Sequence, residues 1–153
     1  MSKRIAIITS RFNEPVTSKL FKGATERLKE LNVPDENVDA YFVPGAVEIP
    51  LIVKQCANRN CYDAIIALGA VIRGETTHYD YVCDQVSQGC QQVMMTFDLP
   101  VIFGVLTTEN AEQAFDRVGG SHGHKGEAAA DAALEMIELM EQIQHGERSK
   151  ELV

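Results

Sequence analysis

Residues 64–72 read AIIALGAVI, an apolar run that only one glycine interrupts. A strand that alternates apolar and polar residues has one face in water, whereas this run carries no polar residue. Such runs are typical of central strands in a parallel sheet, because helices cover these strands on both faces. We therefore predict a buried strand over Asp63–Ile72.

Three further stretches rich in β-branched residues predict partners for this strand: Arg4–Thr9, Val38–Val43 and Val101–Leu106. Turn residues and a helical pattern follow each of the four, and this alternation indicates a parallel sheet with helices on both faces. The sequence predicts a three-layer α/β/α fold of the flavodoxin-like type, with a central four-stranded parallel sheet. The length, 153 residues, fits one domain over residues 1–153.

Capping signals predict where the first three helices begin. The first helix is expected to open at Asn13, with a proline in its first turn, and the second near Pro50. The third is expected after Gly74, where the hydroxyl group of Thr76 or Thr77 can accept a hydrogen bond from a free N–H group.

Two more helices are expected in the last third of the chain. Thr108 can cap a short fourth helix, with Glu109 and Glu112 placed favourably against its dipole. The glycine-rich stretch 119–126 (GGSHGHKG) then leads into a last helix. That helix is expected to bury one apolar face, formed by Ala129, Ala133, Met136, Ile137, Met140 and Ile143. The charged tail at 145–153 is expected to fray.

The overall charge argues against a general nucleic-acid-binding function. The formal net charge is −8, whereas general nucleic-acid binders hold phosphates with clustered Lys and Arg. Hydrophobic residues make up 45% of the chain and the mean hydropathy is −0.10, as in water-soluble globular proteins. We expect no membrane or nucleic-acid partner, although an acidic protein can still bind one phosphate locally.

Cysteine usage and the N-terminus both point to the cytoplasm. Cys56, Cys61, Cys83 and Cys90 form no C-x-x-C pair and lie in apolar segments, which suits free thiols in a reducing compartment. The apolar run near the N-terminus is too short for a signal peptide or a membrane span.

A ligand site is expected beyond the carboxyl ends of the strands, where open α/β sheets bind their ligands. The segments that follow the four predicted strands are rich in reactive or polar groups. They read SRFN at 10–13, PGAVE at 44–48, RGETTHYDY at 73–81 and TTEN at 107–110.

The third segment predicts an anion pocket. Backbone N–H groups of Glu75, Thr76 and Thr77 stay free at the start of a helix, and the helix dipole favours a negative charge there. His78 follows one residue later. The alternative is an ordinary helix cap with a histidine in solvent.

Two residues in the first and second segments have a functional and a structural interpretation. Phe12 could stack on a planar heterocycle at the edge of the sheet, or pack into the core. Glu48 could accept hydrogen bonds from ligand hydroxyl groups, or simply complement a helix dipole.

The glycine-rich stretch lies between two basic residues. Arg117 and Lys125 could clamp a phosphate, or lie in solvent as surface charges. The stretch does not fit the Walker pattern, and the dinucleotide fingerprint is missing after the first strand. His122 and His124 form an H-x-H pair, but no further ligands stand at a zinc spacing, so we expect no metal site.

Five segments in this order resemble the lumazine synthase family. They are SRFN, VPGAVEIP, ALGAVIRGETTHYDYV, PVIFGVLTTENAEQA and the R-x-G-x₅-K-G run from Arg117 to Gly126. The resemblance spans nearly the whole chain, as far as the helix that contains AALEMIEL. It implies condensation of 5-amino-6-ribitylaminouracil with 3,4-dihydroxy-2-butanone 4-phosphate to 6,7-dimethyl-8-ribityllumazine, with release of phosphate and water and without a cofactor.

The resemblance also implies roles for individual residues. It assigns proton transfer to His78, ring stacking to Phe12, and phosphate binding to the turn at Glu75 and Thr76. Three residues, Phe103, Arg117 and Lys125, are expected to enter the site from an adjacent subunit, with Arg117 gripping the phosphate. The remaining substrate contacts are expected at Asn13, Ala46, Val47, Glu48, Ala70, Val71 and Ile72.

The same resemblance implies an assembly of identical subunits, at least a pentamer and up to sixty copies, and names riboflavin synthase as a candidate partner. Two other functions stay open on the sequence alone. One is a flavin- or nucleotide-binding module of the same fold without catalysis, because fold does not determine function. The other is a shell protein without chemistry.

Overall fold

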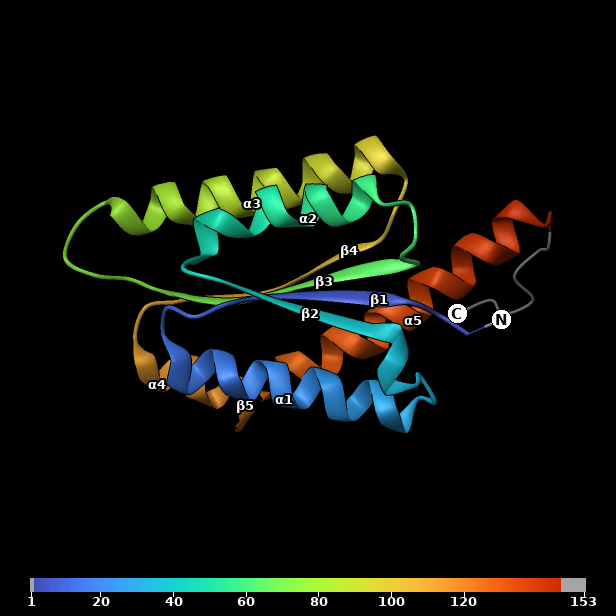
Figure 1. Ribbon diagram of the computed structural model, residues 1–153. Helices are drawn as coiled ribbons and strands as arrows, with labels where there is room; N and C mark the ends of the chain where they lie inside the picture. The colour runs from blue at the N-terminus through green and yellow to red at the C-terminus, as the bar shows by residue number, and fades with distance from the viewer. Residues whose placement is uncertain (1, 147–153) are drawn as a thin grey trace.

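Four parallel strands form the central sheet, in the order β2-β1-β3-β4 (Figure 1). The computed structural model describes residues 2–146. Its elements are β1 (Ile5–Ser10), α1 (Glu14–Glu30), η1 (Asp35–Asn37), β2 (Val38–Val43), η2 (Ala46–Glu48), α2 (Ile49–Asn58), β3 (Ala64–Ile72), α3 (His78–Phe97), β4 (Val101–Thr108), α4 (Ala111–Asp116), β5 (Val118–Gly120), β6 (Gly123–His124) and α5 (Lys125–Gln144). The predicted α/β class and parallel sheet are confirmed.

Helices cover both faces of the sheet, and side chains of β1 alternate between them. Figure 1 shows α2 and α3 on one face and α1 and α5 on the other. Ile5 and Ile7 pack in the cluster beneath α1 and α5, whereas Ala6 and Ile8 pack beneath α2 and α3. Because β1 and β3 occupy the middle of the sheet and are buried on both faces, their apolar runs lack the alternation of a half-exposed strand.

The strands differ from the predicted ranges only near their ends. The sequence placed the end of the fourth strand at Leu106, but β4 continues to Thr108, because Thr107 and Thr108 pair with Val71 and Ile72 of β3. Backbone pairing therefore carries the sheet past the point where apolar residues stop. This extension brings the polar segment after β4 to the same edge as the segment after β3.

Two predictions about the helices are wrong in detail. The cap of α4 is Asn110, whose Oδ1 accepts from the backbone N–H of Gln113, while the Thr108 hydroxyl group donates to the carbonyl oxygen of Asn110. On α5, Met136 and Ile143 are exposed rather than buried. The tail predicted at 145–153 lies outside the described residues from residue 147 onward.

None of the helices described between residues 2 and 146 is long and apolar enough to cross a lipid bilayer.

Candidate functional site

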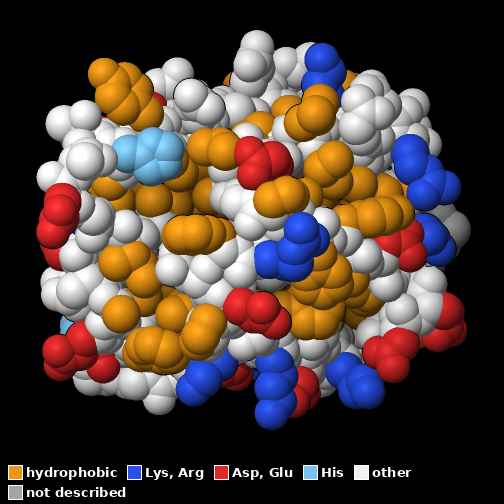
Figure 2. All heavy atoms as spheres, turned by 60° about the vertical axis from the view of Figure 1, so that its left-hand side comes forward, with side chains coloured by type: hydrophobic (Ala, Val, Ile, Leu, Met, Phe, Trp, Pro, Cys, Tyr) orange, Lys and Arg blue, Asp and Glu red, His pale blue; other side chains and the backbone are white. Residues whose placement is uncertain are grey.

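A cavity lies at the carboxyl ends of β1 and β3, where the sequence predicts a site. It has a volume of about 350 Å³. Figure 2 shows that apolar side chains gather at this end of the molecule, with a histidine side chain among them. The wall of the cavity is formed by Phe12, Asn13, Gly45, Ala46, Val47, Ala70, Val71, Ile72, Gly74, Thr76, His78, Tyr79 and Val82.

Phe12 stands at the rim of this cavity instead of packing into the core. Its side chain is 70% exposed, an unusual position for a large apolar ring. The backbone holds it there, since the N–H of Phe12 donates to the carbonyl oxygen of Pro44 at 2.9 Å. An exposed aromatic ring at a cavity mouth is a suitable platform for a planar ligand.

Asn13 shapes the chain directly after Phe12. Its φ is 66°, in the left-handed region that few non-glycine residues adopt, with asparagine among the more tolerant. The side-chain Nδ2 donates to the carbonyl oxygen of Ala70 at 2.8 Å. The Asn13 side-chain amide therefore links the end of β1 to the end of β3. Asn13 also lines the cavity.

Glu48 has a structural partner of its own and is not part of the cavity wall. Its Oε1 accepts from the backbone N–H of Gly45 at 2.9 Å, while the N–H of Glu48 donates to the carbonyl oxygen of Gly45 at 3.2 Å. These two bonds close the turn at η2 reciprocally, as in a capping box. The turn holds Ala46 and Val47 in the wall.

The segment 73–77, between β3 and α3, is exposed throughout. Within residues 2–146, no hydrogen bond uses the backbone N–H groups of residues 74–77. The Thr76 hydroxyl oxygen accepts from the backbone N–H of His78 at 3.3 Å, and Thr77, the helix cap by position, makes no side-chain cap bond. Of the two predicted caps, Thr76 is thus the one that bonds. The unpaired N–H groups at this helix start suit an anion.

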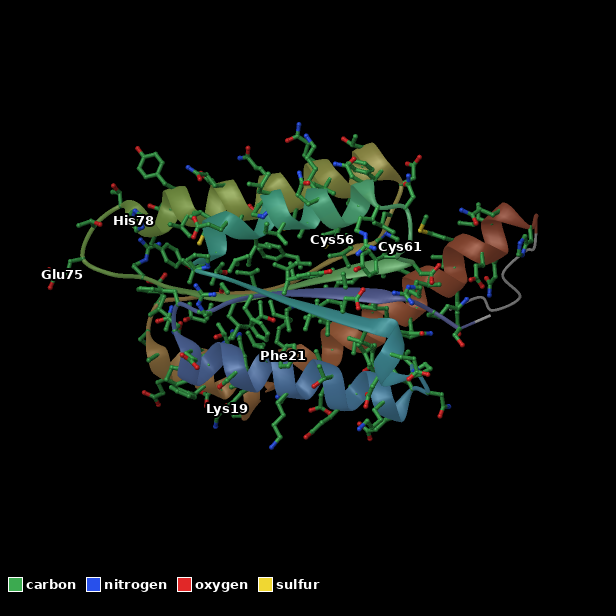
Figure 3. The ribbon with its side chains drawn as sticks, viewed as in Figure 1. Lys19, Phe21, Cys56, Cys61, Glu75 and His78 are labelled. Carbon is green, nitrogen blue, oxygen red and sulfur yellow. The ribbon has the colours of Figure 1, made fainter. Side chains whose placement is uncertain are left out.

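The predicted residues of this segment take different directions. Figure 3 shows Glu75 at the tip of the loop, directed away from the sheet, and His78 at the start of α3. Thr76 and His78 line the cavity, whereas the Glu75 side chain does not. The group of Glu75 that can bind a ligand here is therefore its backbone N–H, not its carboxylate.

Tyr79 and Val82 line the cavity although neither was predicted as a site residue. Burial raises the pKa of the Tyr79 phenol above its ordinary value of 10.0, so the ring is neutral at physiological pH. The missed signal was helical spacing, because Tyr79 and Val82 are three residues apart and therefore lie on the same face of α3. Gly45 and Gly74, also in the wall, are direct neighbours of predicted residues.

Three predicted site residues lie away from the cavity of their own chain. Phe103 is half-buried on β4 and packs against the core beneath α2 and α3. Arg117 follows α4, and its Nη1 donates to the carbonyl oxygen of Gln113 at 3.3 Å. The backbone N–H of Lys125 donates to the carbonyl oxygen of Arg117 at 2.7 Å, so the β5–β6 hairpin sets both basic residues side by side.

His124 holds the N-terminus of α5 and is committed to a structural contact. Its Nδ1 accepts from the backbone N–H groups of Gly126 at 3.1 Å and Glu127 at 3.3 Å. His122 instead lies beside the Ser121 hydroxyl group, at 3.1 Å. In the part of the chain that the structure describes, no three His, Cys, Asp or Glu side chains are grouped in a way that could hold a metal ion.

The cavity therefore combines three kinds of group. An aromatic platform stands at its rim, apolar strand ends form its floor, and a histidine follows a turn with free N–H donors. These groups can hold a flat heterocycle beside an anion and exchange a proton between them.

Comparisons with a family profile and with individual known proteins point to the same enzyme family. A profile of the 6,7-dimethyl-8-ribityllumazine synthase family matches residues 2–141. A 6,7-dimethyl-8-ribityllumazine synthase from Coxiella burnetii (strain Dugway 5J108-111) is 55% identical over 143 residues, which cover 94% of this chain and 95% of the relative. The same enzyme from strains CbuG_Q212 and RSA 493 / Nine Mile phase I is 54% identical with the same coverage.

Proposed function

The chain belongs to the 6,7-dimethyl-8-ribityllumazine synthase family, and on this premise we propose that it catalyses the reaction for which the family is named. It condenses 5-amino-6-ribitylaminouracil with 3,4-dihydroxy-2-butanone 4-phosphate and releases phosphate, water and 6,7-dimethyl-8-ribityllumazine, in riboflavin biosynthesis. The observation that carries this proposal is the meeting of Phe12, His78 and the turn at 74–77 around one cavity of about 350 Å³.

The pyrimidine substrate fits the apolar half of the cavity. Its planar ring stacks on Phe12, while Ala70, Val71 and Ile72 line the opposite side. The ribityl chain lies along Ala46 and Val47. Because Glu48 Oε1 already accepts from Gly45, a ribityl hydroxyl group would reach the second carboxylate oxygen of Glu48.

The phosphorylated substrate fits the polar half. Its phosphate accepts from the free N–H groups of residues 75–77 at the start of α3. A second copy of the chain supplies Arg117 and Lys125 as cations, and Phe103 as an apolar contact. Support for this division comes from the cavity of a single chain, whose wall lacks all three.

The chemistry asks for proton transfer when the first water is lost, when phosphate is lost, and when the ribitylamino nitrogen closes the ring with loss of a second water. The amino group of the uracil attacks the ketone, and a proton must reach the hydroxyl group that leaves as water. Loss of phosphate then requires a proton to leave the carbon between the former ketone and the phosphate-bearing carbon. His78 lines the cavity proposed to hold both substrates and can serve as acid and base, since imidazole is the side chain best suited to this near neutral pH.

The shared site requires an assembly of identical subunits, for which we propose at least a pentamer. Large apolar side chains on the surface support such contacts, because exposed apolar groups commonly mark protein interfaces. Leu51, Tyr81, Met95 and Ile143 are each more than 60% exposed. Riboflavin synthase is the proposed partner of the assembly. The cytoplasm is the proposed compartment, and the four free thiols agree with it.

The experiment combines an absorbance assay for lumazine formation with a mass measurement of the native assembly. Product from the two substrates, together with a mass of five or more subunits, is the expected result. Copurified flavin without product formation would favour a binding module instead. An assembled shell that neither binds the substrates nor forms product would overturn the enzymatic proposal.

A further inference from the structure

Arg73, directly after β3, contacts three residues in two other segments through one guanidinium group. Its Nε donates to Glu109 Oε2 at 2.7 Å, after β4, and its Nη2 donates to Asp80 Oδ1 at 3.4 Å, in the first turn of α3. Its Cζ lies 4.3 Å from the centre of the Tyr79 ring. The backbone N–H of Arg73 donates to the carbonyl oxygen of Thr108 at 2.9 Å.

These contacts fix the direction of the side chain more than they add stability. Partial desolvation lowers the pKa of the Arg73 guanidinium, but Glu109 and Asp80 outweigh this effect and raise the pKa above its ordinary value. The Arg73 side chain is 38% exposed, and ion pairs at such exposure contribute little free energy. A planar guanidinium that meets two carboxylates and a ring face nevertheless has one preferred orientation.

The segment between the anchors has few other contacts. Residues 74–77 are exposed, and the space around Gly74 is open, with no atom within 4 Å of a Cβ placed there. Arg73 fixes the start of this segment through its own backbone and the end through Asp80 and Tyr79. Tyr79 follows His78 directly and lines the cavity beside it.

We propose that Arg73 is a positioning residue, which holds the turn at 74–77 and the first turn of α3 so that the free N–H groups and His78 converge on the bound phosphate ester. The inference rests on the proposed function, because it assigns Arg73 a role in binding the phosphorylated substrate. Arg73 itself lies outside the cavity wall and acts through the residues that it holds.

Arg27 provides a matched control. Its Nε donates to Asp131 Oδ1 at 2.8 Å, and its side chain is 33% exposed, so geometry and burial are close to those of Arg73 with Glu109. Arg27 is on α1 and does not line the cavity. Arg73→Gln and Arg27→Gln therefore remove similar ion pairs, only one of which anchors the turn.

The two variants are compared by steady-state kinetics with each substrate varied in turn. We expect Arg73→Gln to raise the KM for the butanone phosphate about tenfold and to lower kcat severalfold, because small misplacements of binding groups are costly. The KM for the ribitylaminouracil should change by less than about twofold, since Arg73 is not proposed to position the groups that bind that substrate. Arg27→Gln should change none of these values.

A second variant keeps the test valid if Arg73→Gln does not fold. Glu109→Gln retains the contact of Arg73 with Tyr79 and weakens one anchor. It should raise the same KM by a smaller factor. The proposal would be overturned if the ratio of the two KM values stays unchanged in whichever of these variants folds. This holds whether both KM values stay constant or both rise by the same factor.

Titration with inorganic phosphate separates this proposal from the proposed function. If the wild-type chain forms no lumazine, the proposed function fails, but phosphate binding can still be measured calorimetrically. Weaker phosphate binding by Arg73→Gln than by Arg27→Gln would support positioning of the turn. Equal phosphate affinities in the two variants would refute it.

Discussion

A Cβ atom at Gly23 would lie 2.1 Å from Cε1 of His124, so the imidazole ring occupies the space that a side chain on α1 would need. The ring reaches this position from the end of β6, and its Nδ1 caps α5. The contact between α1 and α5 therefore depends on a glycine at one position and on a capping ring at the other.

We predict that Gly23→Ala destabilises the protein, although Gly→Ala within a helix usually stabilises it. The added methyl group would displace the His124 ring, and overpacking of this kind costs about 1–3 kcal/mol. Chemical denaturation measures the change. In the double variant with His124→Ser, a smaller residue that still caps a helix, much of the loss should be recovered. A Gly23→Ala protein more stable than wild type would contradict the packing argument.

For His78→Ala we predict lower turnover but not complete loss. A positioned acid or base contributes typically ~10²- to 10⁴-fold, and the orientation of the two substrates contributes separately. The lumazine absorbance assay measures kcat at saturating substrate. A decrease of about twofold or less would be too small for general acid–base catalysis and would count against the role.

Arg117→Ala should lower the enzymatic activity more than His78→Ala does, because it weakens the affinity for the butanone phosphate. Removal of the guanidinium would leave Lys125 as the remaining side-chain cation proposed for the phosphate. Titration of the variant with that substrate measures the loss directly, and an unchanged affinity would refute the assignment.

Mixed assemblies of these two variants test whether a site is shared between chains. An Arg117→Ala chain keeps His78, and a His78→Ala chain keeps Arg117. When the two are coexpressed in equal amounts, roughly a quarter of the sites at a heterologous interface combine both intact residues. We predict activity well above that of either variant alone. Recovery should be absent if each chain carries a complete site, because every site would then contain one lesion.

The buried thiol of Cys90 makes a prediction about alkaline pH. Burial raises the pKa of this thiol from 9.0 to about 12. Between these values the unfolded chain loses a proton that the folded chain retains, so the free energy of unfolding should fall as pH rises above 9.0. Cys90→Ala should reduce this decrease, as measured by denaturation at several alkaline pH values. An identical pH dependence in both proteins would contradict the burial effect.

Much of the sheet could be predicted because burial on both faces leaves a plain record in the sequence. The apolar run of β3 identified a central strand, and the turn residues after each strand located the cavity. The end of β4 was missed, since Thr107 and Thr108 pair through backbone groups that no side-chain pattern reveals. The exposed Met136 and Ile143 on α5 were predicted as core, because periodicity identifies an apolar face but not what covers it.

Site residues that directly follow strands could be predicted from the sequence. Residues whose hydrogen-bond partners depend on the folded structure were harder to predict. Phe12 and His78 line the cavity, as their places after β1 and β3 indicated. The carboxylate of Glu48 bonds to Gly45, a choice that depends on the conformation of a four-residue turn. The anchors of Arg73 come from two other segments, and sequence spacing alone gives no sign of them.

Asn13 combines a left-handed backbone with a side-chain bond to Ala70. Glycine would accept the backbone angle but lose the bond, aspartate would set a negative charge against a carbonyl oxygen, and glutamine would strain the chain. Attempts to re-engineer the specificity of this enzyme at Phe12 must therefore leave its neighbour untouched. Substitutions at Phe12 are thus limited by the need to keep the Asn13 side-chain amide, which anchors this segment to β3.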